Sequence, residues 1–327
     1  MVLNYIGSKK TLAPRLVQEI VKVWPDLDTW CFCDAFAGTG AVAVAVAPHM
    51  NSILVNDWEP FTQSILKAQF APPPNTLALV DRLNQATPTT GVITLTYSEA
   101  AGRLFFTTLN AQRIDGIREA LRSNTYTEEE RNYLTGVLVS SADSVANVAS
   151  VYGAYLKNFK SSAENLLTLK VIAPAVKRGK VTNMDAQLLA VDPNFIKPNT
   201  LLYLDPPYNQ RQYGANYFPL NAIADINADT IDVVGITGIP TAGYKKSGFC
   251  SKKTAAQNLT HIVKNTPALR IVLSYNNEGI LSHDEIVDIF TKNNWTYRRI
   301  QIPYKRFASQ KDLDPDTVEY LFIANRL

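Results

Sequence analysis

Four consecutive residues, Asp205-Pro206-Pro207-Tyr208, combine an acid, a rigid turn and an aromatic ring. The apolar run LLYL precedes them, and prolines cannot donate to a β-ladder, so the sequence predicts a buried strand that stops at Asp205. The Asp205 carboxylate and the Pro206 carbonyl could accept the two hydrogens of an aromatic amino group. The prolines would hold both acceptors still, and Tyr208 could stack on the base.

A second candidate site is the glycine-containing stretch DAFAGTG, which runs from Asp34 to Gly40. Glycine lets the backbone approach a ligand closely where a strand turns into a helix. Together with Ala43 the stretch also fits the pattern G-x-G-x-x-A, which is typical of dinucleotide sites, and Asp57 follows at the end of the next apolar run as a candidate for binding ribose hydroxyls. This pattern alone leaves two ligands open, a nicotinamide cofactor and another adenosine cofactor.

Two residues of the glycine stretch favour S-adenosylmethionine over a dinucleotide. Asp34 would repel an anionic pyrophosphate, whereas it would attract the ammonium group of a methionine moiety. Phe36 could pack against the ligand. We therefore expect a cofactor with a cationic amino-acid end and no phosphate.

The elements around these residues predict an α/β fold. A helical spacing of apolar residues over 8–24 precedes a short strand over 31–36, the glycine turn, a helix, and a strand over 53–55. This strand–turn–helix–strand order is a βαβ unit. Later strands are expected at 201–204 and 271–274, and two strands without an intervening helix, 297–304 and 318–324, predict a terminal β-hairpin.

Residues 61–175 follow a different pattern, in which helical segments such as 115–121 and 127–139 do not alternate with strands. We therefore expect an inserted, mainly helical domain. Residues 1–60 and 176–327 would form the catalytic domain.

Composition excludes several classes of protein. The chain has 327 residues, 46% of them hydrophobic, and a formal net charge of +3, so a globular protein whose nucleic-acid contacts are confined to local patches is expected. Three scattered cysteines and three histidines without metal-ligand spacing favour a reduced, cytoplasmic protein with no metal site. The longest apolar run is too short to span a membrane, so we expect a soluble protein.

The motifs together resemble the Dam-like, alpha-group adenine-N6 DNA methyltransferases of restriction–modification systems. The resemblance covers most of the chain and rests on NYIGSKKTL, DAFAGTG, VNDWEP, TNMDA, DPPYNQRQYGANY, SYNNEG and YKRF, in the order of that group. It implies a Rossmann-like methyltransferase sheet with a target-recognition insertion, S-adenosylmethionine as cofactor, double-stranded DNA as substrate, and base flipping. It also implies a possible cognate restriction endonuclease that acts separately, and a monomer or weak dimer.

The resemblance assigns roles residue by residue. The catalytic residues would be Asp205, Pro206, Pro207 and Tyr208, with Tyr217 a weaker candidate for the base pocket. Lys9 would lie near the methionine carboxylate, Asp57 near the ribose and Asp185 near the cofactor adenine, although Asp185 could equally cap a helix. The full set of expected cofactor residues is Tyr5, Gly7, Lys9, Asp34, Phe36, Gly38, Gly40, Asp57 and Asp185.

Two stretches mix lysines with aromatic residues and are candidate DNA contacts. Residues 151–162 are expected to recognise the target, and 244–253, which follow the catalytic strand, to bind phosphates. A solvated lysine face is the common alternative for such runs. The expected DNA contacts are Tyr152, Tyr155, Lys157, Lys160, Arg211, Lys245, Lys246, Lys252, Lys253 and Asn276.

Other functions remain open on the sequence alone. The same chemistry could act on RNA or on a protein glutamine amide, although the amide-modifying relatives usually have Asn in place of Asp205. A nicotinamide oxidoreductase would rest on the G-x-G-x-x-A match but lacks an evident catalytic acid–base pair. A non-enzymatic DNA-binding module would leave the glycine turn and the Asp205 loop unexplained.

Overall fold

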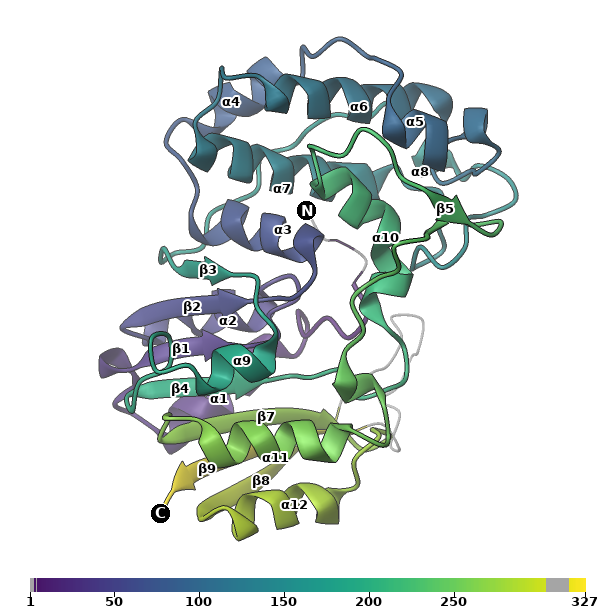
Figure 1. Ribbon diagram of the computed structural model, residues 1–327. Coiled ribbons are helices and arrows are strands. Elements are labelled where there is room, and N and C mark those ends of the chain that lie inside the picture. Colours follow the sequence, from purple (N-terminus) through teal and green to yellow (C-terminus); the bar gives the residue numbers. More distant parts are fainter. Residues whose placement is uncertain (1–2, 4, 304–317) are drawn as a thin grey trace. The chain divides into compact units, whose positions relative to one another are not determined.

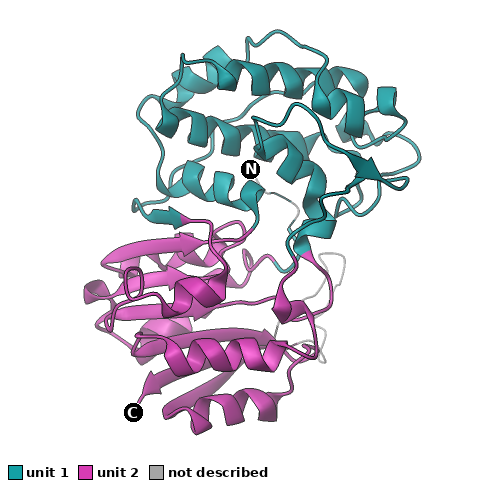
Figure 2. Ribbon diagram, in the orientation of Figure 1, with its two compact units in different colours: residues 1–7, 59–181, 213–245 teal, residues 8–58, 182–212, 246–327 magenta. Residues whose placement is uncertain are grey.

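The computed structural model describes residue 3, residues 5–303 and residues 318–327, which divide into two compact units (Figure 2). The sheet unit comprises Ser8–Trp58, Thr182–Gln212 and Lys246–Leu327. The helical unit comprises Met1–Gly7, Glu59–Val181 and Tyr213–Lys245. Each unit has its own cluster of buried apolar side chains.

A seven-stranded sheet in the order β3-β2-β1-β4-β7-β9-β8 forms the centre of the sheet unit (Figure 1). Strands β2, β1, β4 and β7 are parallel, whereas β9 is antiparallel to both β7 and β8. This topology confirms the predicted Rossmann-like α/β fold and its terminal hairpin. The bounds are β1 Cys31–Asp34, β2 Ser52–Asn56, β3 Lys180–Thr182, β4 Thr200–Leu204, β7 Arg270–Asn276, β8 Trp295–Pro303 and β9 Val318–Arg326.

The central strand β4 is buried at all five positions, as expected for a continuous apolar run in a parallel sheet covered on both faces. Helices α1 (Ala13–Val23) and α2 (Ala41–Val46) cover one face of the sheet. Helices α9 (Ala186–Val191), α11 (Ala255–Asn265) and α12 (His283–Lys292) cover the other (Figure 1). The first helix begins at Ala13 rather than at the predicted Ser8, with Pro14 in its first turn, where a missing N–H costs no hydrogen bond.

The helical unit contains seven helices among its described residues and a short hairpin. The helices are α3 Pro60–Phe70, α4 Thr76–Leu83, α5 Val92–Tyr97, α6 Thr108–Arg122, α7 Glu128–Ser144, α8 Ser161–Glu164 and α10 Tyr213–Ala224. The hairpin pairs β5 Val233–Val234 with β6 Ile239–Pro240. Helix α7 starts with a capping box between Thr127 and Glu130, which explains why a helix begins at this point. Within the described part of the chain, no helix has the length and apolar character needed to cross a membrane.

The helical unit is wider than the predicted insertion of 61–175, because it also takes in 1–7 and 213–245. Helix α10 bends at Tyr217, which has non-helical dihedral angles, and Pro219 lies two residues later. The proline ring restricts the preceding backbone, which accounts for the bend. Phe218, Leu220 and Ile223 of this helix lie in the apolar core of the helical unit, and this packing explains why the segment belongs there.

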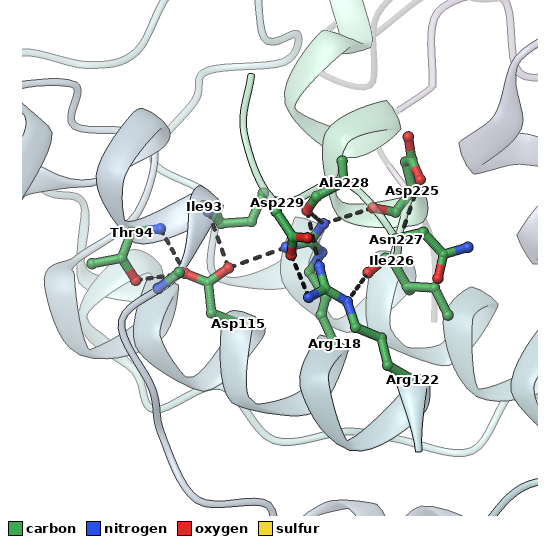
Figure 3. Close-up of polar contacts among 11 residues, drawn as sticks. Ile93, Thr94, Asp115, Arg118, Arg122, Asp225, Ile226, Asn227, Ala228 and Asp229 are labelled. Carbon is green, nitrogen blue, oxygen red and sulfur yellow. Dashed lines mark hydrogen bonds and ion pairs between the residues drawn. The ribbon is translucent and has the colours of Figure 1, made fainter. Parts of the chain in front are cut away.

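A buried polar network fastens the chain after α10 to the rest of the helical unit (Figure 3). The carboxylate of Asp115 accepts hydrogen bonds from the backbone of Ile93 at 3.0 Å and of Thr94 at 2.8 Å, and pairs with Arg118 at 3.3 Å. Arg118 in turn donates to the carbonyl oxygens of Asp225 and Ala228. The contacts of Asp115 and Arg118 therefore tie α5, α6 and the segment after α10 together.

Candidate active site

The carboxyl ends of four parallel strands carry most of the predicted site residues. Asp34 ends β1, Asp57 follows β2, Asp205 follows β4, and Asn276 ends β7. Register pairs Asp34 with Tyr203 and with Val55, so these strand ends share one edge of the sheet. Ligands of open α/β sheets bind beyond this edge. The structure thus brings three acids that are remote in sequence to one place.

The glycine turn has the backbone conformation that its sequence predicts. Gly38 and Gly40 have positive φ angles of 52° and 78°, which glycine adopts without a Cβ clash. The backbone N–H of Gly38 donates to the carboxylate of Asp57 at 2.8 Å. Asp57, which we expected to bind the ribose, therefore also holds the glycine turn in place.

Asn56 is a structural residue of the site that sequence reasoning missed. Its fully buried side chain donates to the carbonyls of Ala35 and Met184, both at 3.0 Å, and accepts from the backbone of Met184 at 2.8 Å. An asparagine at the end of an apolar strand could have indicated this role, because a buried amide group needs hydrogen-bond partners. Asn56 thereby joins the end of β1 to the segment that enters α9.

Asp34 is a buried acid to which no cation is paired among the described residues. Its side chain is 2% exposed and accepts a hydrogen bond from the backbone of Phe36 at 3.3 Å. Burial raises the pKa of Asp34 well above its ordinary value, and the nearby Asp205 carboxylate raises it further. Because a cationic ligand group would relieve this cost, Asp34 fits the ammonium end of S-adenosylmethionine.

Two further cofactor candidates are placed by local contacts. Phe36 packs edge-on against Phe249, with ring centroids 5.3 Å apart. The Asp185 carboxylate accepts from the backbone N–H of Gln187 at 2.8 Å and caps the start of α9. Asp185 therefore caps a helix, as the alternative interpretation of the sequence predicted. Its contact with the adenine of a cofactor stays a prediction.

Asp205 belongs to a buried cluster in which one lysine faces two acids. The Lys9 Nζ atom lies 3.1 Å from an Asp205 oxygen and 3.1 Å from a Glu319 oxygen. The three side chains are 5%, 14% and 1% exposed, respectively. Burial raises the pKa of Asp205 to about 7, against the opposing effect of Lys9 and with a further contribution from Glu319. Burial alone would lower the pKa of Lys9, but the two carboxylates hold it well above its ordinary value.

Glu319 was not predicted from the sequence. It is the single charged residue within the apolar run VEYLFIA and pairs in register with Asn276 across β9 and β7. Its carboxylate also accepts a hydrogen bond from the Ser274 hydroxyl. An acid at an inward-facing strand position was a usable signal, since buried charges are rare without a partner. The remote lysine that it would face could not be identified from spacing.

The loop after Asp205 holds Tyr208 at the same edge of the sheet. The Tyr208 ring packs edge-on to Tyr275, with ring centroids 6.2 Å apart, and Lys9 Nζ lies 5.2 Å from its centroid. Its carbonyl accepts from the backbone of Ile280 at 2.9 Å. The ring is partly exposed, so one part of it remains available to a ligand.

The end of the loop after Asp205 contacts the lysine-containing stretch that is predicted to bind phosphates. Gln212 accepts from the backbone of Ser247 at 2.8 Å and donates to its carbonyl at 3.2 Å. The carbonyl of Arg211 accepts from the Cys250 thiol. Arg211, Lys246, Lys252 and Lys253 are exposed, whereas Lys245 is half-buried and belongs to the helical unit. Most of these cations are thus at the surface, and the stretch that carries them contacts the loop after Asp205.

The N-terminal segment divides between the two units. Tyr5 and Gly7 belong to the helical unit, where the Tyr5 ring stacks on Tyr217 with centroids 5.5 Å apart. The hydroxyl of Tyr217 accepts from the backbone of Ile6 at 2.8 Å, and that of Tyr213 donates to the Ile6 carbonyl at 3.0 Å. Tyr217 is fully buried in these contacts, so we assign it to the core and not to a base pocket.

Two expected DNA contacts are buried instead. Tyr152 is fully buried, and its hydroxyl donates to Asp143 at 2.8 Å. Asn276 is 5% exposed and accepts from the backbone of Glu278 at 2.6 Å, which shapes the turn after β7. Neither side chain offers a surface to a duplex, so both leave the set of proposed DNA contacts.

The other candidates of the 151–162 stretch keep some surface. Lys157 is exposed, Tyr155 is half-buried, and Lys160 donates its ammonium group to the carbonyl of Val148 at 2.8 Å. The predicted motif YKRF, at 304–307, lies outside the described residues.

The sheet topology is that of a Rossmann-like α/β fold with acids at the ends of its parallel strands. Residues 5–289 match the family of D12 class N6 adenine-specific DNA methyltransferases, and the chain belongs to this family. It is therefore an S-adenosylmethionine-dependent enzyme that methylates adenine in DNA.

Curated relatives agree with this assignment over the whole chain. The Type II methyltransferase M.NlaIII of Neisseria lactamica is 36% identical, covering 99% of each chain. M.CviAII of Paramecium bursaria Chlorella virus 1 is 36% identical over 98% of this chain and 97% of its own. M.FokI of Planomicrobium okeanokoites is 30% identical over 98% of this chain, which corresponds to 52% of that longer protein.

Proposed function

We propose that the Asp205 carboxylate and the Pro206 carbonyl accept hydrogen bonds from the N6 amino group of the target adenine. The observation that carries this proposal is the acid's position at the end of the buried central strand, with a pKa raised by burial to about 7. An aromatic amine is a poor nucleophile because its lone pair is delocalised into the ring. Two fixed acceptors would turn that lone pair towards the methyl donor.

The sheet unit supplies the residues that would hold the cofactor. S-adenosylmethionine, when bound, provides a methyl group on a sulfonium. Asp34 would neutralise its ammonium group, and Phe36 would pack beside it. The glycine turn at Gly38 and Gly40 would let the backbone approach it, and Asp57 and Asp185 would receive its ribose and adenine. The buried carboxylate of Asp34, to which no cation is paired among the described residues, supports this orientation.

Each unit has candidate DNA contacts. The target adenine must leave the duplex before it reaches Asp205, and Tyr208 offers a partly exposed ring for the flipped base. Arg211, Lys246, Lys252 and Lys253 would contact phosphates. The helical unit, with Tyr155 and Lys157, would recognise the target sequence. Lys245 and Lys160 would contribute weakly, because both are half-buried.

The biological setting follows from the relatives. We infer that the chain is the modification enzyme of a restriction–modification system, because two relatives named as Type II methyltransferases match nearly its full length. A cognate endonuclease would then act separately. We also propose a cytoplasmic protein that works as a monomer or weak dimer.

One experiment tests the proposed substrate directly. The protein is incubated with S-adenosylmethionine labelled in its methyl group and, in parallel, with plasmid DNA, RNA or an unrelated protein. We expect label in DNA alone, recovered as N6-methyldeoxyadenosine after digestion to nucleosides. Label in N4-methyldeoxycytidine, or transfer to RNA or protein, would contradict the proposal. The family assignment already decides against the nicotinamide and non-enzymatic alternatives.

A further inference from the structure

The cluster around Lys9 carries more negative charge than the lysine can neutralise. One ammonium group lies 3.1 Å from each of two carboxylates, Asp205 and Glu319, and all three side chains are largely buried. Asp34, also buried, lies close enough for Asp205 to raise its pKa. One ammonium group can neutralise the charge of only one carboxylate, so Lys9 leaves one negative charge of Asp205 and Glu319 without compensation.

Glu319 is held firmly in this position. Its backbone pairs with Asn276 across β7 and β9, and the Ser274 hydroxyl donates to the same oxygen that faces Lys9. Its second carboxylate oxygen is buried and has no hydrogen-bond partner among the described atoms. A buried, incompletely satisfied acid costs stability, and an apolar side chain would fill a strand position at lower cost. Stability therefore does not explain why an acid occupies this position.

We propose that Glu319 is a positioning residue for methyl transfer. Its carboxylate contacts the Lys9 ammonium group, so the positive charge of Lys9 is shared between two carboxylates. Asp205 is then only partly neutralised by Lys9, and it can accept hydrogen bonds, and afterwards a proton, from the target amine. This inference rests on the proposed role of Asp205. Glu319 lies beyond residues 5–289, over which the family match extends.

The proton balance of the reaction explains why such tuning matters. As the bond from N6 to the methyl carbon forms, the bond from that carbon to sulfur breaks, and its electron pair stays on sulfur. N6 becomes cationic and gives up one proton to the Asp205 carboxylate, which then returns it to water. An Asp205 fully neutralised by Lys9 would be a weaker acceptor at both stages.

The charged and titratable groups that face Asp205 come from every side. Lys9 precedes α1, Glu319 comes from β9, Asp34 ends β1, and Tyr203 lies on β4 itself. Burial and Glu319 raise the pKa of Asp205, and Lys9 lowers it. Removing the Glu319 charge should therefore lower this pKa.

The test is the pH dependence of kcat/KM, which reports groups of the free enzyme. For Glu319→Gln we expect the acidic limb to move down by about one pH unit. At pH 8, kcat should fall several-fold, up to about tenfold, because Asp205 is a weaker acceptor. The dissociation constants of cofactor and DNA should change less than twofold.

A conservative variant separates charge from packing. Glu319→Asp keeps the charge but shortens the side chain, whereas Glu319→Gln keeps the shape and loses the charge. We expect Asp to restore the acidic limb to its original pH. Asp143→Asn, a buried acid that bonds Tyr152 in the helical unit, is the control for loss of any buried carboxylate and should leave the limb unchanged.

Two results would overturn the inference. The first is an acidic limb of the pH profile that stays in place in Glu319→Gln but is lost in Glu319→Asp, because the shape of the side chain, and not its charge, would then matter. If Glu319→Gln does not fold, carbon-13 NMR of the side-chain carboxyls in the wild-type protein decides instead. We expect the Asp205 carboxyl to titrate near pH 7, because burial and the charge of Glu319 raise its pKa, and a midpoint near the ordinary 3.8 would refute the proposal. An Asp205→Ala variant that still methylates DNA would instead refute the proposed function.

Discussion

The two buried acids Asp115 and Asp205 show how differently one residue type can be used. Asp115, in the helical unit, accepts from three backbone N–H groups and a threonine hydroxyl, and pairs with Arg118. Asp205, in the sheet unit, shares one lysine with Glu319, and burial raises its pKa to about 7. The first acid has its charge fully compensated, and the second does not.

The difference has a physical consequence for the role of each. A compensated buried acid stabilises the fold through its partners, which would be orphaned without it. An uncompensated one costs stability and keeps a proton affinity near neutral pH, which suits chemistry. We therefore expect removal of Asp205 to impair catalysis and removal of Asp115 to impair folding.

The largest effect is expected for Asp205→Ala. Methyl transfer should fall on the order of a thousandfold or below detection, because the amine loses its charged acceptor. Cofactor binding, measured by calorimetry, should persist. The melting temperature at pH 8 should be unchanged or higher, since Lys9 keeps Glu319 as partner. Turnover equal to wild type would refute the catalytic role of Asp205.

Asp115→Ala should show the opposite pattern. The change orphans the backbone N–H groups of Ile93 and Thr94 and leaves Arg118 buried without its acid. We expect a loss of about 3–5 kcal/mol in the free energy of unfolding, or a melting temperature lower by roughly 10 °C. Asp288→Ala, which breaks an exposed pair with Lys292, is the control and should cost less than about 1 kcal/mol. If both variants lost the same free energy of unfolding, the buried ion pair of Asp115 would contribute no more to stability than the exposed pair of Asp288.

Exposed charged residues belong to neither class of buried acid, and we expect a smaller effect when they are removed. Lys252→Ala combined with Lys253→Ala should weaken DNA binding and reduce the salt slope of log K by about 2, since each lysine would release one counterion. The turnover of bound DNA should not change. Lys22→Ala, an exposed lysine on α1 that pairs with Glu19, should leave the slope unchanged. A slope unaffected by the double variant would exclude these lysines from phosphate binding.

The sequence predicts the scaffold well for reasons that are local. An apolar run bounded by breakers and an acid marks β1, β2 and β4, and glycines mark the turn before α2. These signals depend on neighbours in the chain. The strand-end positions of Asp34, Asp57 and Asp205 follow from the same local rules.

The remaining features depend on contacts between distant segments. No spacing relates Lys9 to Glu319, and the bonds of Asn56 link three strand ends that only the folded sheet brings together. Tyr152 and Asn276 illustrate the converse. Polar or aromatic residues within a lysine-rich or asparagine-rich motif look exposed in sequence, yet the fold uses them in its interior.

The pH dependence of kcat/KM for the wild-type enzyme tests most directly whether Asp205 is an uncompensated, functional acid. The carboxylate must be ionised to accept hydrogen bonds from the amine, so activity should rise with pH as Asp205 loses its proton. Burial and Glu319 place that pKa at about 7, above the ordinary 3.8. We predict an acidic limb with its midpoint near pH 7 in methylation of DNA. A midpoint near pH 4, with full activity at pH 6, would contradict this explanation of the site.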